Sequence, residues 1–247
     1  MVAENVDVMD ERTEECMIKT VNIDNVISRE LLENKLSIPT GMDVPQVAVA
    51  GVFIMFHRNS DGFPLMVEPR KWASVQNSGE IAAGVIVVEG GKMLVVAPTE
   101  ATLLWSSATV NGGGKMTTDR LTALADWRGR TSTEVQVTKP ECNTDNYAPG
   151  YCNRYSRVNT NGQGLTAGRW WLPSLGEMLM IFANMQKVNY ALSLINGATL
   201  LTEAWYWSST EASTSYAWGV GLGNGIANYG TKNTSQGLVR PVSTFLR

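Results

Sequence analysis

The sequence predicts an α+β protein, in which a domain of short helices and antiparallel strands follows a small N-terminal module. Apolar runs of strand length, separated by turn residues, fill much of residues 44–97. Helical spacing of apolar residues is confined to short segments within residues 118–195. From residue 206 onward, large and small residues alternate around a hairpin signal. Strands and helices that are segregated along the chain are typical of the α+β class.

The first 43 residues differ from the rest of the chain in charge. They hold ten acidic and four basic residues, a net charge of −6, which leaves +3 for the remainder. A short helix is expected at residues 28–35, ended by Pro39 and Gly41. We assign residues 1–77 to an N-terminal region for assembly or attachment, through which the chain could form a homo-oligomer. Residues 78–247 are assigned to a ligand-binding domain.

The strands of the first half are expected to be buried. Residues 44–56 form a strand-like run that ends at a turn over residues 59–62. Residues 83–88 and 93–97 flank the turn sequence Glu-Gly-Gly-Lys and predict a hairpin. Because the apolar runs are unbroken, both faces of these strands should be covered.

Short helices are expected in the middle of the chain. The first spans residues 118–127, since Leu121, Leu124 and Ala125 lie on one side of it. Residues 131–168 are rich in Asn, Thr, Gly and Pro and are expected to be mostly loop.

A capping box opens the next helix, because Ser174 is followed three residues later by Glu177. The apolar residues of its expected buried face recur at helical spacing: Leu175, Met178, Leu179, Phe182 and Met185. A further short helix over residues 188–195 ends at Asn196 and Gly197.

Residues 217–233 are typical of a hairpin. The large residues of its first strand share one parity and should face a core: Trp218, Val220 and Leu222. The small residues share the other parity and should face outward: Ala217, Gly219, Gly221 and Gly223. Asn224 and Gly225 predict a two-residue turn in which both positions have positive φ. Residues 239–245 are expected to form a central strand beside the hairpin, with Trp207 and Trp218 in the core.

Composition excludes several classes of protein. With 44% hydrophobic and 17% charged residues, the chain can bury a sizeable core. A net charge of −3 without a long basic cluster argues against a nucleic-acid partner. The longest apolar run, residues 47–56, is too short to span a bilayer, so no membrane insertion is expected. Residues 1–15 lack the apolar stretch of a secretory signal.

The sequence offers little for catalysis or metal binding. His57 is the only histidine, which excludes a site with several histidine ligands. The glycine-rich residues 110–115 lack the spacing of a phosphate-binding loop. Glu203 and Glu211 flank an aromatic segment, and paired carboxylates near aromatics are typical of glycosidases. Their spacing, with a strand between them, favours instead a cap and a framework hydrogen-bonding role. We therefore expect a protein that is not an enzyme and that holds no cofactor and no metal.

The three cysteines, Cys16, Cys142 and Cys152, are too few for a disulfide framework. Two states remain open for the later pair. Cys142 and Cys152 could form a bridge across the turn at Pro149 and Gly150, or they could be unpaired thiols.

Several motifs of the C-terminal half resemble one family. They are Trp-Leu-Pro-Ser-Leu-Gly-Glu at residues 171–177, Tyr-Trp-Ser-Ser-Thr-Glu at 206–211 and Val-Arg-Pro-Val at 239–242. These segments resemble the C-type lectin fold in its formylglycine-generating-enzyme-like branch. They resemble more closely the ligand-binding variable proteins of diversity-generating retroelements in gut bacteria and phages. The resemblance covers about residues 78–247, and it implies a C-type lectin fold with two short helices and an antiparallel sheet.

The chain departs from two relatives of that family. The Glu-Pro-Asn, Gln-Pro-Asp and Trp-Asn-Asp motifs of calcium-dependent sugar-binding lectins are absent, and no acidic residue follows Glu211. The enzyme branch uses cysteines near its C-terminal end, whereas no cysteine follows Cys152 here. A calcium-bridged sugar site and formylglycine-type chemistry are therefore not expected.

The resemblance implies a diversified ligand-binding surface in the C-terminal part. In that family, mutagenesis of AAC-type codons gives residues such as Asn, Ser, Thr, Tyr, Gly, Ala and Ile, but not Trp, Lys or Gln. Residues 212–238 are rich in the permitted types, and their Tyr, Ser, Gly and Asn suit a binding surface. Trp218 and Lys232 match framework positions. The expected ligand-binding residues are Tyr206, Ala212, Thr214, Ser215, Tyr216, Gly219, Gly221, Gly223, Ile226, Asn228, Tyr229, Thr231, Asn233 and Thr234.

The expected function is that of a receptor-binding or adhesin-like protein. Its ligand would be a cell-surface protein or a glycan, and its location a phage virion or a bacterial cell surface. Two alternatives remain open: a fixed structural subunit of a phage tail or pilus, and an enzyme of the formylglycine-generating type.

Overall fold

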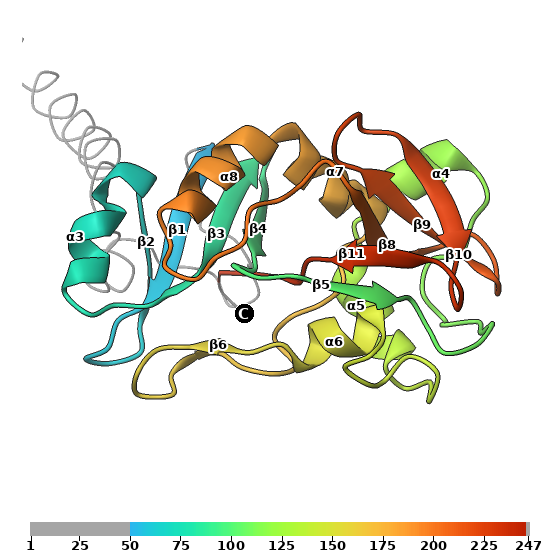
Figure 1. The fold of residues 1–247 in the computed structure, drawn as a ribbon, viewed down its shortest axis with the longest axis horizontal. Coiled ribbons are helices and arrows are strands. Elements are labelled where there is room, and N and C mark those ends of the chain that lie inside the picture. Colours follow the sequence, from blue (N-terminus) through green and yellow to red (C-terminus); the bar gives the residue numbers. More distant parts are fainter. Residues whose placement is uncertain (1–49, 246–247) are drawn as a thin grey trace, which may run out of the picture.

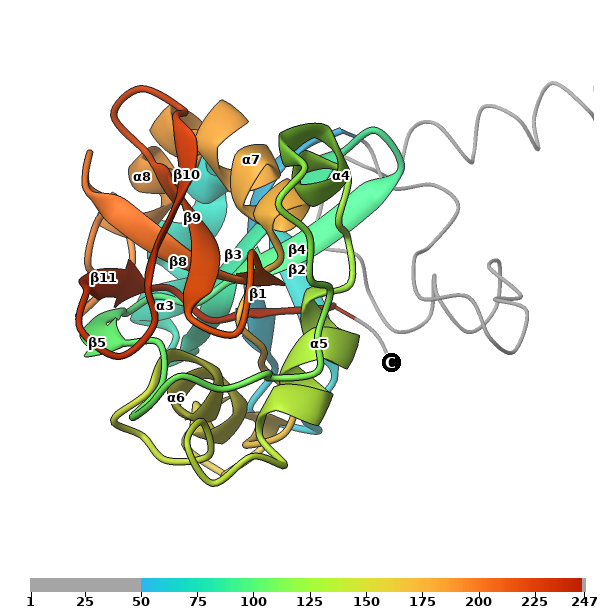
Figure 2. The same cartoon turned by 90° about the vertical axis from the view of Figure 1, so that its right-hand side faces the viewer.

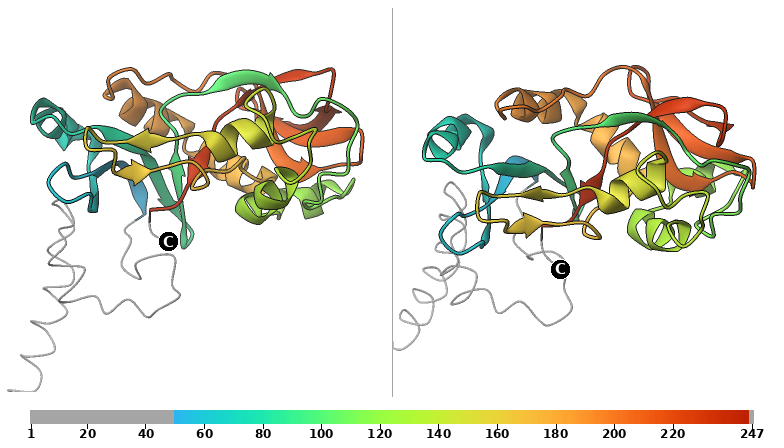
Figure 3. Two further views of the ribbon diagram at one scale, coloured as in Figure 1. Left: turned by 90° about the horizontal axis from the view of Figure 1, so that it is seen from below. Right: turned by 60° about the horizontal axis from the view of Figure 1, so that its bottom comes forward.

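The computed structural model describes residues 50–245 (Figure 1). These residues form two five-stranded sheets, a two-stranded ribbon and several short helices, so the predicted α+β class is confirmed. The helix expected at residues 28–35 and the start of the strand expected at 44–56 lie outside the described residues. Figures 1 and 3 show the two large sheets side by side along the long axis of the molecule.

The first large sheet is antiparallel throughout and has the strand order β12-β4-β3-β1-β2. The strands β3 and β4 form the predicted hairpin, in which Gly90 and Gly91 occupy the turn with φ of 55° and 73°. All residues of β3 except the last are buried, as the unbroken apolar run predicts. The strands are β1 (Gly51–His57), β2 (Pro64–Val67), β3 (Ala82–Glu89), β4 (Lys92–Val96) and β12 (Val242–Ser243).

The domain boundary expected between residues 77 and 78 lies directly after a short helix that ends at Asn77. Strands β1 and β2 come from before that boundary, yet they belong to the same sheet as β3 and β4. Between β2 and β3 the chain forms the 3-10 helix η2 (Pro69–Lys71) and α3 (Trp72–Asn77). The assembly or attachment role of residues 1–77 stays a prediction.

The second large sheet has the strand order β10-β9-β8-β11-β5. Neighbouring strands are antiparallel except β8 and β11, which are parallel. The strands β9 and β10 are the predicted hairpin, and β10 is the edge strand. The strands are β5 (Ala101–Leu104), β8 (Trp205–Glu211), β9 (Tyr216–Gly221), β10 (Ala227–Thr231) and β11 (Gln236–Val239).

The helices α7 (Leu175–Ala183) and α8 (Met185–Ser193) cover both sheets along one side of the molecule (Figure 1). Helix α7 contacts β3 of the first sheet and β8 and β9 of the second, while α8 contacts β1 and β3. One hydrophobic cluster therefore joins Val85, Leu175 and Trp218 from three elements. The capping box of Ser174 and Glu177 is present at the start of α7, as predicted.

The middle of the chain differs from its prediction in two ways. Helix α4 (Arg120–Leu124) is shorter than expected, and Leu121 is 76% exposed whereas Ala123 is buried. The predicted buried face of α4 is wrong, because a helix of five residues is too short for apolar spacing to determine which side is buried. Residues 131–168 are mostly loop, as predicted, but they also contain most of α5 (Gly129–Gln136) and all of α6 (Ala148–Arg154), which the sequence did not predict.

The remaining strands, β6 (Arg157–Val158) and β7 (Gly164–Leu165), form a ribbon that runs back from α6 toward the first sheet (Figure 3). Arg157 Nε donates to Ala82 O at 3.0 Å, and Asn159 Nδ2 donates to His57 O at 3.1 Å. These bonds hold the ribbon against the first sheet.

The single strand expected at residues 239–245 is two strands in two sheets. Strand β11 lies between β8 and β5, and β12 lies at the edge of the first sheet. The chain crosses between the sheets at Arg240 and Pro241, where proline cannot donate to a ladder. Pro241 O instead accepts from Ala97 N at 2.9 Å. The predicted burial of Trp207 and Trp218 is confirmed.

The hairpin turn is longer than predicted. Residues 222–226 connect β9 to β10, and among them Gly225 alone has a positive φ, of 71°. Asn224 instead uses its side chain, because its Oδ1 accepts from Ile226 N at 3.0 Å.

Candidate ligand-binding face

The structure divides the expected ligand-binding residues by exposure. The exposed members lie on the β9–β10 hairpin and its neighbouring loops: Thr214, Tyr216, Gly223, Ile226, Asn228, Tyr229 and Thr234. The half-buried members are Ser215, Gly221, Thr231 and Asn233. The buried members are Tyr206, Ala212 and Gly219. Only the exposed and half-buried groups can contact a ligand. We call the exposed group the hairpin face.

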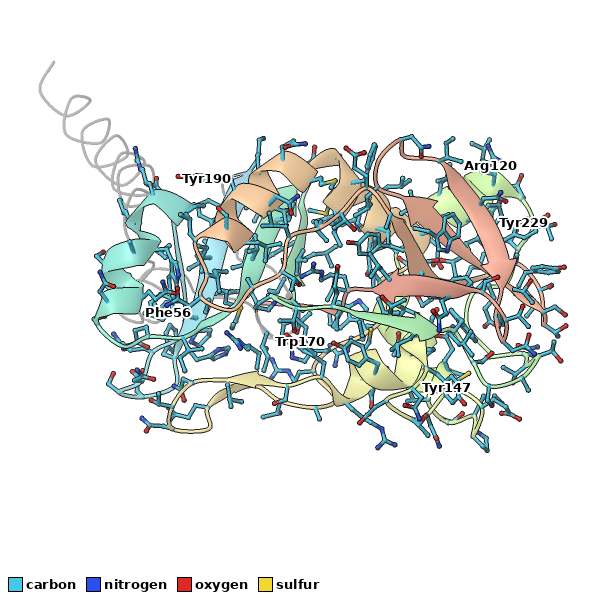
Figure 4. All side chains as sticks on the ribbon, viewed as in Figure 1. Phe56, Arg120, Tyr147, Trp170, Tyr190 and Tyr229 are labelled. Carbon is cyan, nitrogen blue, oxygen red and sulfur yellow. The ribbon has the colours of Figure 1, made fainter. Side chains whose placement is uncertain are left out.

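Two tyrosines dominate the hairpin face. Tyr216 on β9 is 41% exposed and Tyr229 on β10 is 44% exposed. Their ring centroids lie 5.5 Å apart with the planes inclined by 61°. Tyr229 also packs edge-to-face on the buried Trp218, at 5.1 Å and 86°. The tyrosine pair therefore packs on the core through Trp218. Figure 4 shows Tyr229 far from Tyr190, which lies toward the other end of the molecule.

Trp218 fixes this pair to the loop before α4. Its Nε1 donates to Thr117 O at 2.8 Å, and the neighbouring Met116 is 36% exposed. Met116 also bridges to Glu211 at the end of β8. Sequence reasoning missed this loop as a neighbour of the face, because no local pattern relates residues about a hundred positions apart.

Tyr206 was expected to contact a ligand, and the structure contradicts this. Its side chain is fully buried, its Oη accepts from Thr202 N at 3.0 Å, and it donates to Glu100 Oε2 at 2.9 Å. Tyr206 pairs with Val220 across the strands, so it shares the core-facing side of β9. Its burial raises the pKa of its hydroxyl.

Three glycines of the second sheet, on β9, β10 and β11, pack against tryptophan rings. A Cβ on Gly219 would lie 2.5 Å from the ring of Trp205, and one on Gly230 would lie 2.8 Å from the ring of Trp207. A Cβ on Gly237 would lie 2.9 Å from both rings. These three glycines thus make room for two tryptophans, which explains part of the glycine content that suggested a binding surface.

Ala212 and Ala217 complete this correction. Ala217 is fully buried in a cluster with Trp105 and Trp207, against the expectation that it faces outward. Ala212 is buried at the start of the β8–β9 loop, where its N–H donates to Tyr216 O at 2.9 Å. Neither side chain is available to a ligand.

A buried ion pair holds the loops beside the hairpin face. Lys232 Nζ lies 2.5 Å from Glu211 Oε2, and both side chains are fully buried. The glutamate also accepts from Gly112 N at 2.8 Å and Gly114 N at 3.0 Å, and Lys232 Nζ donates to Val110 O at 2.7 Å. Burial lowers the pKa of Lys232, while the neighbouring Glu211 carboxylate opposes that shift. Glu211 is thus a framework hydrogen-bonding residue, as its position suggested.

A second buried cation joins the two sheets. Arg240 Nη2 lies 2.6 Å from Glu100 Oε2, and Nη1 donates to Ala97 O at 3.0 Å. The same carboxylate oxygen accepts from Tyr206. The Val-Arg-Pro-Val motif therefore holds the crossing between the sheets rather than a ligand.

Burial shifts the pKa values of several titratable side chains near the core. Cys142 and Cys152 are buried, unpaired thiols. Burial raises the pKa of Cys142 to about 12, and it also raises the pKa of Cys152 well above its ordinary value. Burial, aided by Arg169, lowers the pKa of His57 to about 4. Within residues 50–245, no group of three or more His, Cys, Asp or Glu side chains could hold a metal ion.

Comparison with solved structures gives a distant likeness. A fimbrial protein from Bacteroides ovatus ATCC 8483 aligns over 61% of this chain and 35% of its own, with a TM-score of 0.46 and 19% identity. The chain thus spans about a third of the length of that fimbrial protein. No curated protein matches. Among the described helices, none has the length and apolarity needed to cross a bilayer.

The sequence itself gives the family. Residues 94–243 match the profile of the Lcl C-terminal domain, and this match includes β5, β8–β11, α4–α8 and every residue of the hairpin face. The matched segment is well over half of the 247 residues, so the chain belongs to the Lcl C-terminal domain family.

Proposed function

We propose that the protein is a non-enzymatic, adhesin-like or receptor-binding protein that binds its ligand through the hairpin face. One observation supports this most strongly: Tyr216 and Tyr229 are partly exposed, lie in contact, and rest on the buried Trp218. Rigid tyrosines give a large contact area at a low cost in conformational entropy. The surrounding Thr214, Asn228 and Thr234 add hydroxyl and amide groups for hydrogen bonds.

The hairpin face carries no charge of its own. Lys232 is the only charged residue between residues 212 and 238, and it is buried against Glu211. Binding should therefore depend on shape, apolar contact and neutral hydrogen bonds rather than on electrostatic attraction. A cell-surface protein or a glycan fits this chemistry.

The finer part of the proposal concerns diversification. The chain would be a variable protein of the diversity-generating-retroelement type with a C-type lectin fold, displayed on a phage virion or bacterial surface. The buried Glu211–Lys232 and Arg240–Glu100 pairs support this, because they fix the framework without using any residue of the hairpin face. Exposed substitutions on such a framework usually change stability by only about 0.5 kcal/mol.

The test compares two tyrosine variants of the full chain on arrays of glycans and of bacterial and host surface proteins. Binding by Tyr216→Ala/Tyr229→Ala should be at least about tenfold weaker than wild type, because these side chains would be the aromatic anchors. Tyr190→Ala is the matched control, since Tyr190 is 55% exposed on α8 and lies far from the pair (Figure 4).

Wild-type binding should also persist between about 0.05 and 0.5 M salt, because no charge is involved. Equal binding by the double variant and the control would contradict the proposal. It would favour the fixed structural subunit, whose hairpin makes permanent contacts within an assembly.

A further inference from the structure

A separate hollow lies between the β3–β4 hairpin and α5. Its volume is about 320 Å³, which is enough for a molecule with a single ring. The lining includes Lys92 on β4, Trp127 just before α5 and Arg130 on α5. It also includes Trp171 just before α7 and Glu177 on α7. It shares no residue with the hairpin face. Figure 2 shows the β3–β4 turn, α4 and α5 together on one side of the molecule.

Each tryptophan of this pocket lies beside a cation. Lys92 Nζ lies 5.2 Å from the ring centroid of Trp127, and Arg130 Cζ lies 6.0 Å from that of Trp171. Trp127 is 37% exposed, so a ring entering the pocket can reach its surface. Arg130 Nε also bonds Glu134 at 3.0 Å, but both side chains are well exposed, so this contact is weak and exchangeable.

Glu177 forms the polar floor of the pocket. Its Oε2 accepts from Ser174 N at 2.8 Å and from Trp171 Nε1 at 3.2 Å. Its Oε1 has no hydrogen-bond partner among the residues that the structure describes. Gly129 keeps the space beside the carboxyl open, since a Cβ there would collide with Glu177 Oε2 and lie 2.7 Å from Ser174 N. Since Glu177 lines the pocket, its carboxyl can take part in binding a ligand there.

We propose that this pocket binds a carboxylate carried on a single six-membered ring. The ring would pack against Trp127, and the carboxylate would take charge-assisted bonds from Lys92 and Arg130. The protonated carboxyl of Glu177 would donate its Oε1 hydrogen to the ligand. This site lies outside the hairpin face, so it goes beyond the proposed function.

Binding to this pocket should depend on pH. Burial raises the pKa of Glu177 to about 7, helped by repulsion from Asp126 and opposed by the bonds from Ser174 and Trp171. The charged groups around it are Asp126 before α5, Arg130 on α5 and Lys92 on β4. The change comes from Glu177, because above pH 7 its carboxylate repels the ligand carboxylate. Affinity should fall as pH rises through 7.

The experiment measures binding by calorimetry and ligand-observed NMR with two pairs of probes. Methyl glucuronide and its neutral partner methyl glucoside represent a sugar acid, and phenylacetate and phenylacetamide represent an aromatic acid. At least one carboxylate should bind the full chain while its neutral partner binds at least about tenfold more weakly. Binding of methyl glucuronide would identify the ring as a sugar, and binding of phenylacetate would identify it as aromatic.

Three variants locate the binding. Lys92→Met/Arg130→Met should weaken carboxylate binding at least about tenfold, whereas Lys187→Met, on the exposed surface of α8, should leave it unchanged. Glu177→Gln should remove the fall in affinity above pH 7. The proposal is overturned if neither carboxylate binds at millimolar concentration, if the neutral partners bind equally, or if the double variant binds as wild type does. None of these results bears on the hairpin face.

Discussion

At the scale of single residues, the same residue types serve two opposite purposes in this chain. Tyr216 and Tyr229 are surface aromatics, whereas Tyr206, only ten residues earlier than Tyr216, is a buried hydrogen-bonding residue. Gly223 lies open to solvent, whereas Gly219 makes room for the ring of Trp205. Composition alone therefore overestimates the binding surface, and burial separates the two groups.

Trp218 should be the most important side chain beneath the hairpin face. It is 2% exposed, supports Tyr229, and donates to Thr117 O. Trp218→Ala should lower the free energy of unfolding by about 3–5 kcal/mol, because a large buried ring leaves a cavity. Urea unfolding measures this, with Tyr216→Ala as the half-exposed comparison. Equal stability of the two variants would show that Trp218 is not part of the core.

Glu177 should make stability depend on pH. Its pKa rises from 4.5 to about 7 on folding, so the native state keeps a proton that the unfolded state releases between these values. This contribution to stability is fully present below pH 4.5 and is lost as pH rises through 7, by up to about 3 kcal/mol. His57 acts in the opposite direction, because burial lowers its pKa to about 4.

Comparing the unfolding free energy of wild type and Glu177→Gln from pH 4.5 to 8 isolates this group, since His57 is common to both. The variant should gain stability relative to wild type as pH rises. Parallel curves would show that the carboxyl does not titrate near neutrality.

At the scale of elements, the sequence predicts those features that local pattern determines. The β3–β4 hairpin, the capping box of α7 and the core-facing parity of β9 are all present. The split of residues 239–245 between two sheets could not be predicted, because the partners of β11 and β12 lie far away along the chain. The burial of Gly219 on β9 could not be predicted for the same reason, because the ring that covers it belongs to Trp205 on the neighbouring strand β8.

The loops beside the hairpin face should depend on the Glu211–Lys232 pair. Lys232→Met should destabilise the protein by about 3–5 kcal/mol, because it leaves the Glu211 carboxylate buried without its cation. Glu211→Gln/Lys232→Met removes both charges and should recover part of this loss. Thermal and urea unfolding of the wild type and both variants measure the difference. A double variant less stable than the single one would contradict this view of the pair.

At the scale of the whole molecule, the family match and the hairpin face lie in the same region. The profile covers residues 94–243, while the first sheet takes β1, β2 and β3 from before that segment. The motifs that carry the resemblance, such as Val-Arg-Pro-Val and the framework Lys232, are buried parts of the scaffold. The sequence therefore predicts the buried scaffold of the site better than the residues that contact a ligand. Buried scaffold residues form recognisable motifs, whereas the exposure of a contact residue depends on the packing of distant parts of the chain.

The central claim is that the exposed residues of the hairpin face can change while the framework beneath them cannot. Two displayed libraries test it most directly, each with Trp207, Trp218, Lys232 and Arg240 unchanged. The first randomises exposed positions: Thr214, Tyr216, Asn228, Tyr229 and Thr234. The second randomises the glycines that pack against tryptophan rings: Gly219, Gly230 and Gly237.

Protease resistance reports folding, and selection against an unrelated protein such as lysozyme reports new binding. We predict that most members of the first library fold and that binders emerge from it, whereas most members of the second fail to fold. If the first library fails to fold as often as the second, the hairpin face is structural and the ligand-binding account is wrong.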